Sequence, residues 1–144
     1  MSKFSVSGCG SYLLVTSGCT IFVYRLLNRK YPCSVQDASG MDIAPVTSIS
    51  CCAEVLTATI DTTTPNPVVG ALLRGRIGMI CDLDMDTVRT LNSSESSGGM
   101  PPSNPSSRRY YHDLCSADDP PRNISICPGR RCLAFGCSSG IELH

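Results

Sequence analysis

The chain has 144 residues, and its 12 basic and 12 acidic residues give a formal net charge of zero. A neutral chain exerts little long-range attraction on nucleic acid or on an anionic membrane, so we expect neither as a partner. No apolar run approaches the length of about 18 residues that a spanning helix needs, and residues 1–4 lack the apolar run of a signal peptide. We therefore expect a cytoplasmic or nuclear protein.

Three apolar stretches stand out along the chain, at residues 12–26, 68–83 and 132–144. Each consists of two short runs rich in Val, Ile, Leu, Phe or Tyr, with a glycine-containing link between the runs. Such runs are typical of strands, and glycine supplies the positive φ that a tight hairpin turn requires. The sequence therefore predicts an all-β protein made of antiparallel β-hairpins.

The hairpins look like copies of one unit. Residues 4–24 align without a gap on residues 124–144 at a constant offset of 120, and apolar residues coincide at most apolar positions. The middle hairpin joins the alignment when Gly75 is set on Gly18, with an upstream strand expected at residues 55–60. Repeats of this size indicate a repeat array or a propeller rather than a single closed sandwich.

Polar spacers separate the predicted units. Residues 92–109 contain seven Ser and three Pro, and they cannot bury enough apolar surface to offset an ordering cost of about 1–2 kcal/mol per residue. The predicted organisation is a first hairpin at 1–27, a second blade-like unit at 46–83, a polar and largely disordered insertion at 84–121, and a truncated third unit at 122–144.

The opening of the first unit, residues 4–8, alternates apolar residues with serine and is followed by an apolar strand, a Ser-Gly turn and a second strand. This pattern resembles a WD-repeat propeller blade. Residues 124–129 repeat the opening, and Cys81-Asp82 occupies the place where such blades carry a Trp-Asp pair. Residues 130–144 further resemble a segment of uncharacterised fungal propeller-like proteins. The resemblance implies incomplete β-propeller blades, and hence a fragment whose closure depends on missing sequence or on self-association.

Propeller-like folds commonly hold protein partners on the loops between blades, so the resemblance implies a non-enzymatic interaction scaffold with protein partners and no cofactor. A small-molecule substrate is not expected. Residues 136–140 read Gly-Cys-Ser-Ser-Gly and match a serine nucleophile elbow by letter. An elbow needs a following helix and then an acid and a histidine, and only residues 141–144 follow. We therefore do not expect a hydrolase.

The best candidate for a partner-binding surface is the patch Arg108, Arg109, Tyr110, Tyr111 and His112. Arginine and tyrosine are over-represented at binding hot spots, and the patch emerges directly from the serine- and proline-rich stretch of the insertion. The alternative is structural: the two tyrosines would then anchor the outer strand of the next blade.

Ten cysteines leave a cysteine-rich zinc module as the alternative function. Cys127, Cys132 and Cys137 have regular Cys-x4-Cys-x4-Cys spacing. Structural zinc sites usually combine a Cys-x2–4-Cys pair with a second such pair or with a His pair. No Cys-x2-Cys is present, and His112 and His144 lie far apart in the sequence, so no metal ligands are predicted. Most cysteines lie in apolar runs, where a reduced cysteine acts as a small hydrophobic residue.

Overall fold

The computed structural model describes residues 1–26, 45–84 and 108–144. The all-β prediction is confirmed, since these residues form three antiparallel sheets and one short 3-10 turn, η1 (Pro128–Arg130). Sheet 1 contains β1 (Lys3–Val6), β2 (Tyr12–Ser17), β3 (Thr20–Arg25) and β4 (Pro45–Ser50). Sheet 2 contains β5 (Val55–Asp61), β6 (Val68–Leu73), β7 (Ile77–Asp82) and β8 (Arg108–Tyr111). Sheet 3 contains β9 (Asn123–Cys127), β10 (Cys132–Gly136) and β11 (Ile141–Leu143).

Every sheet is a meander in which each strand pairs with the next strand along the chain. Sheets 1 and 3 also share one register: Phe4 lies opposite Val15, and Ile124 lies opposite Phe135 at the offset of 120. The predicted alignment of the two segments therefore corresponds to a common three-stranded unit. In the described ranges no helix is long and apolar enough to cross a membrane.

The turn chemistry explains where the strands reverse. Gly18, with φ of 57°, lies in the two-residue link between Ser17 and Thr20. The corresponding link in sheet 2 has three residues and places Gly75 and Arg76 at φ of 89° and 59°. Positive φ is favourable for glycine, which is why the glycines mark these reversals in the sequence.

Two predicted boundaries need correction. Residues 46–50 were assigned to the second unit, but β4 pairs with β3 and completes sheet 1. The insertion predicted at 84–121 contains β8, which pairs with β7 and completes sheet 2. Residues 85–107 lie outside the described part of the chain. Neither pairing was predicted, because a polar stretch of sequence separates β4 from β3 and β8 from β7.

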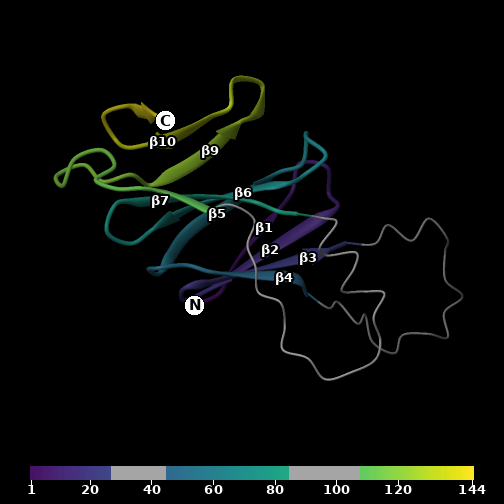
Figure 1. Cartoon of the computed structure of the whole chain (residues 1–144). Coiled ribbons are helices and arrows are strands. Elements are labelled where there is room, and N and C mark those ends of the chain that lie inside the picture. The colour runs from purple at the N-terminus through teal and green to yellow at the C-terminus, as the bar shows by residue number, and fades with distance from the viewer. Residues whose placement is uncertain (27–44, 85–107) are drawn as a thin grey trace, which may run out of the picture.

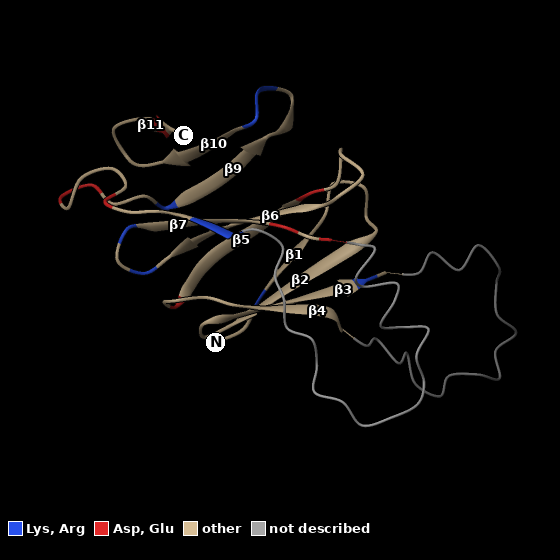
Figure 2. Ribbon diagram, in the orientation of Figure 1, with Lys and Arg blue, Asp and Glu red and all other residues tan. Residues whose placement is uncertain are grey.

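The three sheets are stacked, with sheet 2 between the other two (Figure 1). We call the face of sheet 1 or sheet 2 that points toward the next sheet along the chain its front, and the face of sheet 2 or sheet 3 that points toward the preceding sheet its back. The opposite face of sheet 1 is its back, and the opposite face of sheet 3 is its front. Leu14, Ile21 and Val23 on the front of sheet 1 share one core cluster with Val69, Ala71 and Met79 on the back of sheet 2. Leu72 and Ile80 on the front of sheet 2 share a second cluster with Leu133 and Phe135 on the back of sheet 3. Apart from β8, charged residues lie mainly in loops and at strand ends, so most residues within the strands are uncharged (Figure 2).

Sheets 2 and 3 approach each other closely at two glycines. A Cβ atom on Gly78 would lie 2.4 Å from Cζ of Phe135, and one on Gly70 would lie 3.1 Å from Cδ1 of Ile124. The front of sheet 2 therefore accommodates the bulky side chains of sheet 3 because two of its own positions carry no side chain.

Replacing Gly78 with alanine should destabilise the protein, because the new methyl group overlaps the buried Phe135 ring. Overpacking of this kind costs about 1–3 kcal/mol in the free energy of unfolding. Gly136→Ala is the matched control, since its Cβ would lie 3.8 Å from the nearest neighbour, at ordinary contact distance. Urea midpoints measure both variants, and equal midpoints would contradict the proposed packing.

Candidate functional site

The predicted partner-binding residues lie on and just after β8, the last strand of sheet 2. Side chains alternate along a strand, so the patch is divided between two sides of the sheet. Tyr110 packs on the core cluster shared with sheet 1, and Tyr111 packs on the cluster shared with sheet 3. Arg108 points toward sheet 1, where its Nη1 donates a 2.6 Å hydrogen bond to the carbonyl oxygen of Ser50. Arg109 and His112 are exposed.

The tyrosines act as anchors of β8. The ring of Tyr111 lies 6.5 Å from the ring of Phe135 and 5.0 Å from that of His144, centroid to centroid. Tyr110 lies 6.5 Å from His112 by the same measure. The alternative interpretation of the patch, in which the two tyrosines anchor an outer strand, therefore describes their packing. One part of it needs correction, because β8 is the outer strand of sheet 2 and not of the following sheet. Arg109 and His112 remain as the exposed members of the patch.

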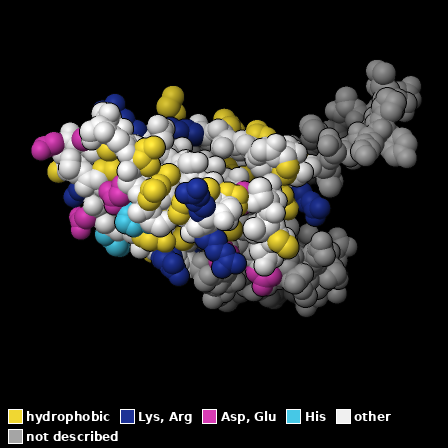
Figure 3. Space-filling view, turned by 90° about the horizontal axis from the view of Figure 1, so that it is seen from above, with side chains coloured by type: hydrophobic (Ala, Val, Ile, Leu, Met, Phe, Trp, Pro, Cys, Tyr) yellow, Lys and Arg dark blue, Asp and Glu magenta, His cyan; other side chains and the backbone are white. Residues whose placement is uncertain are grey.

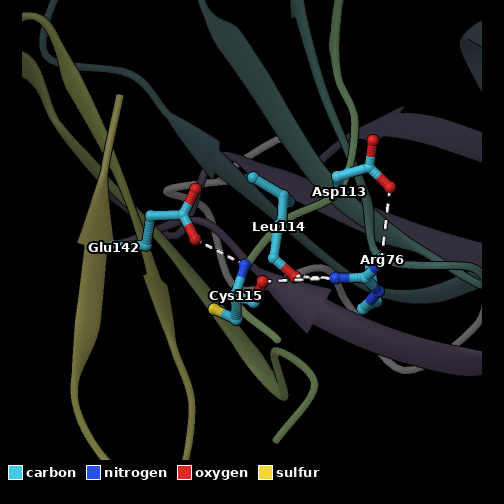
Figure 4. Close-up of polar contacts among 5 residues, drawn as sticks. All are labelled: Arg76, Asp113, Leu114, Cys115 and Glu142. Carbon is cyan, nitrogen blue, oxygen red and sulfur yellow. Dashed lines mark hydrogen bonds and ion pairs between the residues drawn. The ribbon is translucent and has the colours of Figure 1, made fainter. Parts of the chain in front are cut away.

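The loop that follows β8 is fastened to the β6–β7 turn by Arg76 (Figure 4). Its guanidinium donates hydrogen bonds to the carbonyl oxygens of Leu114 and Cys115 at 3.5 and 3.2 Å, and it pairs with Asp113 at 3.3 Å. The backbone NH of Leu114 donates in return to the Arg76 carbonyl at 3.1 Å. Asp113 and Cys115 adopt positive φ of 56° and 55°, and between them Leu114 is fully buried. These contacts hold the loop against the β6–β7 turn.

The same loop is fastened to sheet 3 through Glu142. The backbone NH of Cys115 donates a short hydrogen bond to Oε2 of Glu142, and the other oxygen, Oε1, lies 2.5 Å from Nε2 of His144. The hydrogen bond with His144 is the main reason why the pKa of Glu142 is lowered. Burial raises the pKa of the Cys115 thiol to about 11, so this thiol is protonated at neutral pH.

Asp119 closes the loop against the turn between β10 and β11. Its two carboxylate oxygens accept hydrogen bonds from the backbone NH groups of Ser138 and Ser139, at 2.9 and 2.8 Å. Hydrogen bonds from Ser139 and Ser138 hold the pKa of Asp119 well below its usual range. Between this loop and the turn lies an open hollow of about 230 Å³, whose lining includes Cys137 and Glu142.

The elbow-like residues 136–140 therefore form a hairpin turn capped by a carboxylate. The NH of Ser138 is occupied by Asp119, and the ring of His144 is paired with Glu142. An oxyanion hole would need NH groups that are open to substrate. The arrangement supports a structural interpretation of this motif.

The thiols considered for zinc do not converge. Cys127 and Cys132 lie opposite each other on β9 and β10. Cys137 follows Cys132 by five residues in an extended segment, which separates them by roughly 16 Å. Across the described ranges no group of three or more His, Cys, Asp or Glu residues could hold a metal ion.

Cys9 is an exposed thiol whose pKa is lowered by its neighbours. It lies in the turn between β1 and β2, where Ser7 Oγ lies 3.3 Å from the sulfur and Thr62 Oγ1 donates to the sulfur at 3.1 Å. Hydrogen bonds from Ser7 and Thr62 lower its pKa to about 6. The serine at position 7 was visible in the sequence, but Thr62 comes from the loop after β5, far away along the chain, so sequence reasoning missed this thiol.

Comparison of the chain with protein-family models, curated proteins and solved structures gives no match. Its function must therefore be argued from the arrangement of its own residues.

Asp119 provides a test of the loop contact by pH. Its pKa is lowered in the folded chain, so its stabilisation is complete above the unfolded pKa of about 4 and is lost as the pH falls through the folded value. Asp119→Asn should be less stable than wild type at pH 7, and the difference should shrink below pH about 4. Urea unfolding at several pH values measures this difference. Asp118→Asn on the neighbouring exposed residue is the control, and an identical effect there would contradict the assignment.

Cys9 should react with iodoacetamide at neutral pH, because most of it is thiolate above pH about 6. Cys51 and Cys115 should stay largely unlabelled, since burial raises the pKa of each to about 11. Mass spectrometry of the labelled peptides between pH 5 and 8 measures the individual rates. Thr62→Val removes one donor and should move the midpoint of Cys9 labelling to higher pH; an unchanged midpoint would contradict the role of Thr62.

Proposed function

We propose that the chain is a non-enzymatic protein-interaction scaffold whose three sheets are blades of an incomplete WD-repeat-like β-propeller. The observation that supports this most directly is the shared register of sheets 1 and 3, combined with the front-to-back stacking of all three sheets. In a propeller the blades repeat one meander and cover one another in the same way. The proposal assigns the chain to the cytoplasm or nucleus and requires no cofactor.

The proposed binding surface is the outer edge of β8 with Arg109 and His112. β8 ends the strand order of sheet 2, so the backbone groups on its outer side can pair with an extended segment of a partner. Among the described residues the guanidinium of Arg109 has no hydrogen-bond or ion-pair partner, unlike Arg108, which is bound to sheet 1. An exposed, unpaired guanidinium beside a strand edge suits an extended peptide that carries a carboxylate.

A displayed library of random peptides tests this surface. Peptides selected on the immobilised chain should contain acidic residues, and Arg109→Ala should weaken their binding at least about tenfold, as expected for the loss of a hot-spot arginine. Arg130→Ala is the matched control, because Arg130 is also exposed and lies in η1, the turn between β9 and β10, rather than on β8. Selected peptides that bind the Arg109 variant as tightly as wild type would refute this binding surface, and so would the absence of any selected peptide.

A further inference from the structure

Sheets 1 and 3 bury opposite faces of the same meander. In β2 the buried leucine is Leu14, whereas in β10 it is Leu133, which corresponds at the offset of 120 to Leu13. Neighbouring residues of a strand point to opposite faces. Sheet 2 covers the front of sheet 1 and the back of sheet 3, so in the described part of the chain no sheet covers the back of sheet 1 or the front of sheet 3.

Both uncovered faces carry exposed apolar side chains. Phe4 and Val6 on the back of sheet 1 are 71% and 58% exposed, and Ile141 and Leu143 on the front of sheet 3 are 72% and 65% exposed. Apart from Met1, these are the exposed large hydrophobic residues of the described ranges. Figure 3 views the molecule from the side of sheet 3 and shows hydrophobic side chains at its surface. Exposed apolar residues concentrated on two faces indicate contact surfaces.

The positions that face each other between sheets are matched in size. On the back of sheet 3, Phe135 fills the space left by Gly78 on the front of sheet 2. By strand register, the residue on the back of sheet 1 that corresponds to Phe135 is Val15, and the residue on the front of sheet 3 that corresponds to Gly78 is Ile141. A smaller back residue would thus meet a larger front residue, so the bulk that Phe135 supplies from the back face at the existing contact would come from Ile141 on the front face instead.

A second pair of positions shows the same relation. Ile124 and Ile126 lie against Gly70 on the front of sheet 2. Their counterparts on the back of sheet 1 are the exposed Phe4 and Val6, and the counterpart of Gly70 on the front of sheet 3 is Ala134, another small residue. The two uncovered faces therefore have the shape and chemistry of the two halves of a contact that the molecule already makes.

We propose that the front of sheet 3 in one copy of the chain packs on the back of sheet 1 in a second copy, head to tail. The contact is heterologous, and two copies can satisfy both pairs of faces in one closed ring. Each copy supplies three sheets, so the ring holds twice that number, within the range of about four to eight blades found in propellers. The inference depends on the order and faces of the sheets and not on peptide binding at β8, so either can fail alone.

Single charges placed on each face test the contact. In sedimentation experiments over about 1–100 µM, which covers the weak end of affinities for standard-sized interfaces, wild type should form dimers. Phe4→Asp and Ile141→Asp should each raise the dissociation constant at least about tenfold, because an aspartate would be buried without a partner. Asn66→Asp adds the same charge in the exposed β5–β6 loop and should leave the dimer intact.

Mixing the two variants distinguishes head-to-tail contact from other modes. An equimolar mixture of Phe4→Asp and Ile141→Asp keeps one unaltered pair of faces, so heterodimers should form at concentrations where each variant alone is monomeric. Circular dichroism establishes first that both variants retain the β-sheet signal, and Val6→Asp with Leu143→Asp provides an independent pair. Monomeric wild type would refute the proposal and leave the faces to another polypeptide. A dimer that survives Ile141→Asp, or a mixture of folded variants that stays monomeric, would refute it equally.

Discussion

The central sheet is the constraint on which the structure depends, because both of its faces are buried. Val69, Ala71 and Met79 point to sheet 1, and Leu72 and Ile80 point to sheet 3. A strand covered on both sides loses the alternation of polar and apolar residues, which explains the continuous apolar run in β6. It also needs space for side chains from both neighbours, and Gly70 and Gly78 provide that space toward sheet 3. Within the described part of the chain, sheets 1 and 3 are each covered on one face only and depend on sheet 2 for their burial.

The sequence was sufficient to predict the all-β class, the three hairpins and the alignment of the first and third units. Apolar runs and turn glycines are local signals, and both survive in the structure at Gly18 and Gly75. The fourth strands, β4 and β8, could not be predicted in the same way. Their pairing is with strands from which polar stretches separate them, and contacts over such distances leave no local pattern.

The candidate site was predicted only in part. The sequence predicted a partner-binding patch at residues 108–112, but strand alternation directs its two tyrosines into separate core clusters. That division depends on which sheet β8 joins, which the sequence did not reveal. The environment of Cys9 could not be predicted for a similar reason, since Thr62 approaches it from the loop that follows β5 of sheet 2. In both cases the missing information was the contact between sheets rather than the chemistry of the residues.

Apolar burial brings the sheets together, but it is non-directional and does not by itself fix how one sheet is oriented on the next. Directional contacts supply this information at the ends of the strands. Lys3 donates to the Leu56 carbonyl at 2.7 Å, and Arg108 donates to Ser50, so two cations link sheets 1 and 2 through backbone oxygens.

Sheets 2 and 3 are linked differently, by the loop that Arg76 and Asp119 fasten at its two ends. The described loop after β8 thus serves a structural role, in that it connects the register of sheet 2 to the turn of sheet 3. Since a hydrogen bond weakens steeply with distance and angle, such contacts select one orientation from the many that apolar faces would permit. The uncovered faces of sheets 1 and 3 offer exposed apolar side chains for a contact of this kind. A stable contact between them would also need hydrogen bonds of its own at the strand ends.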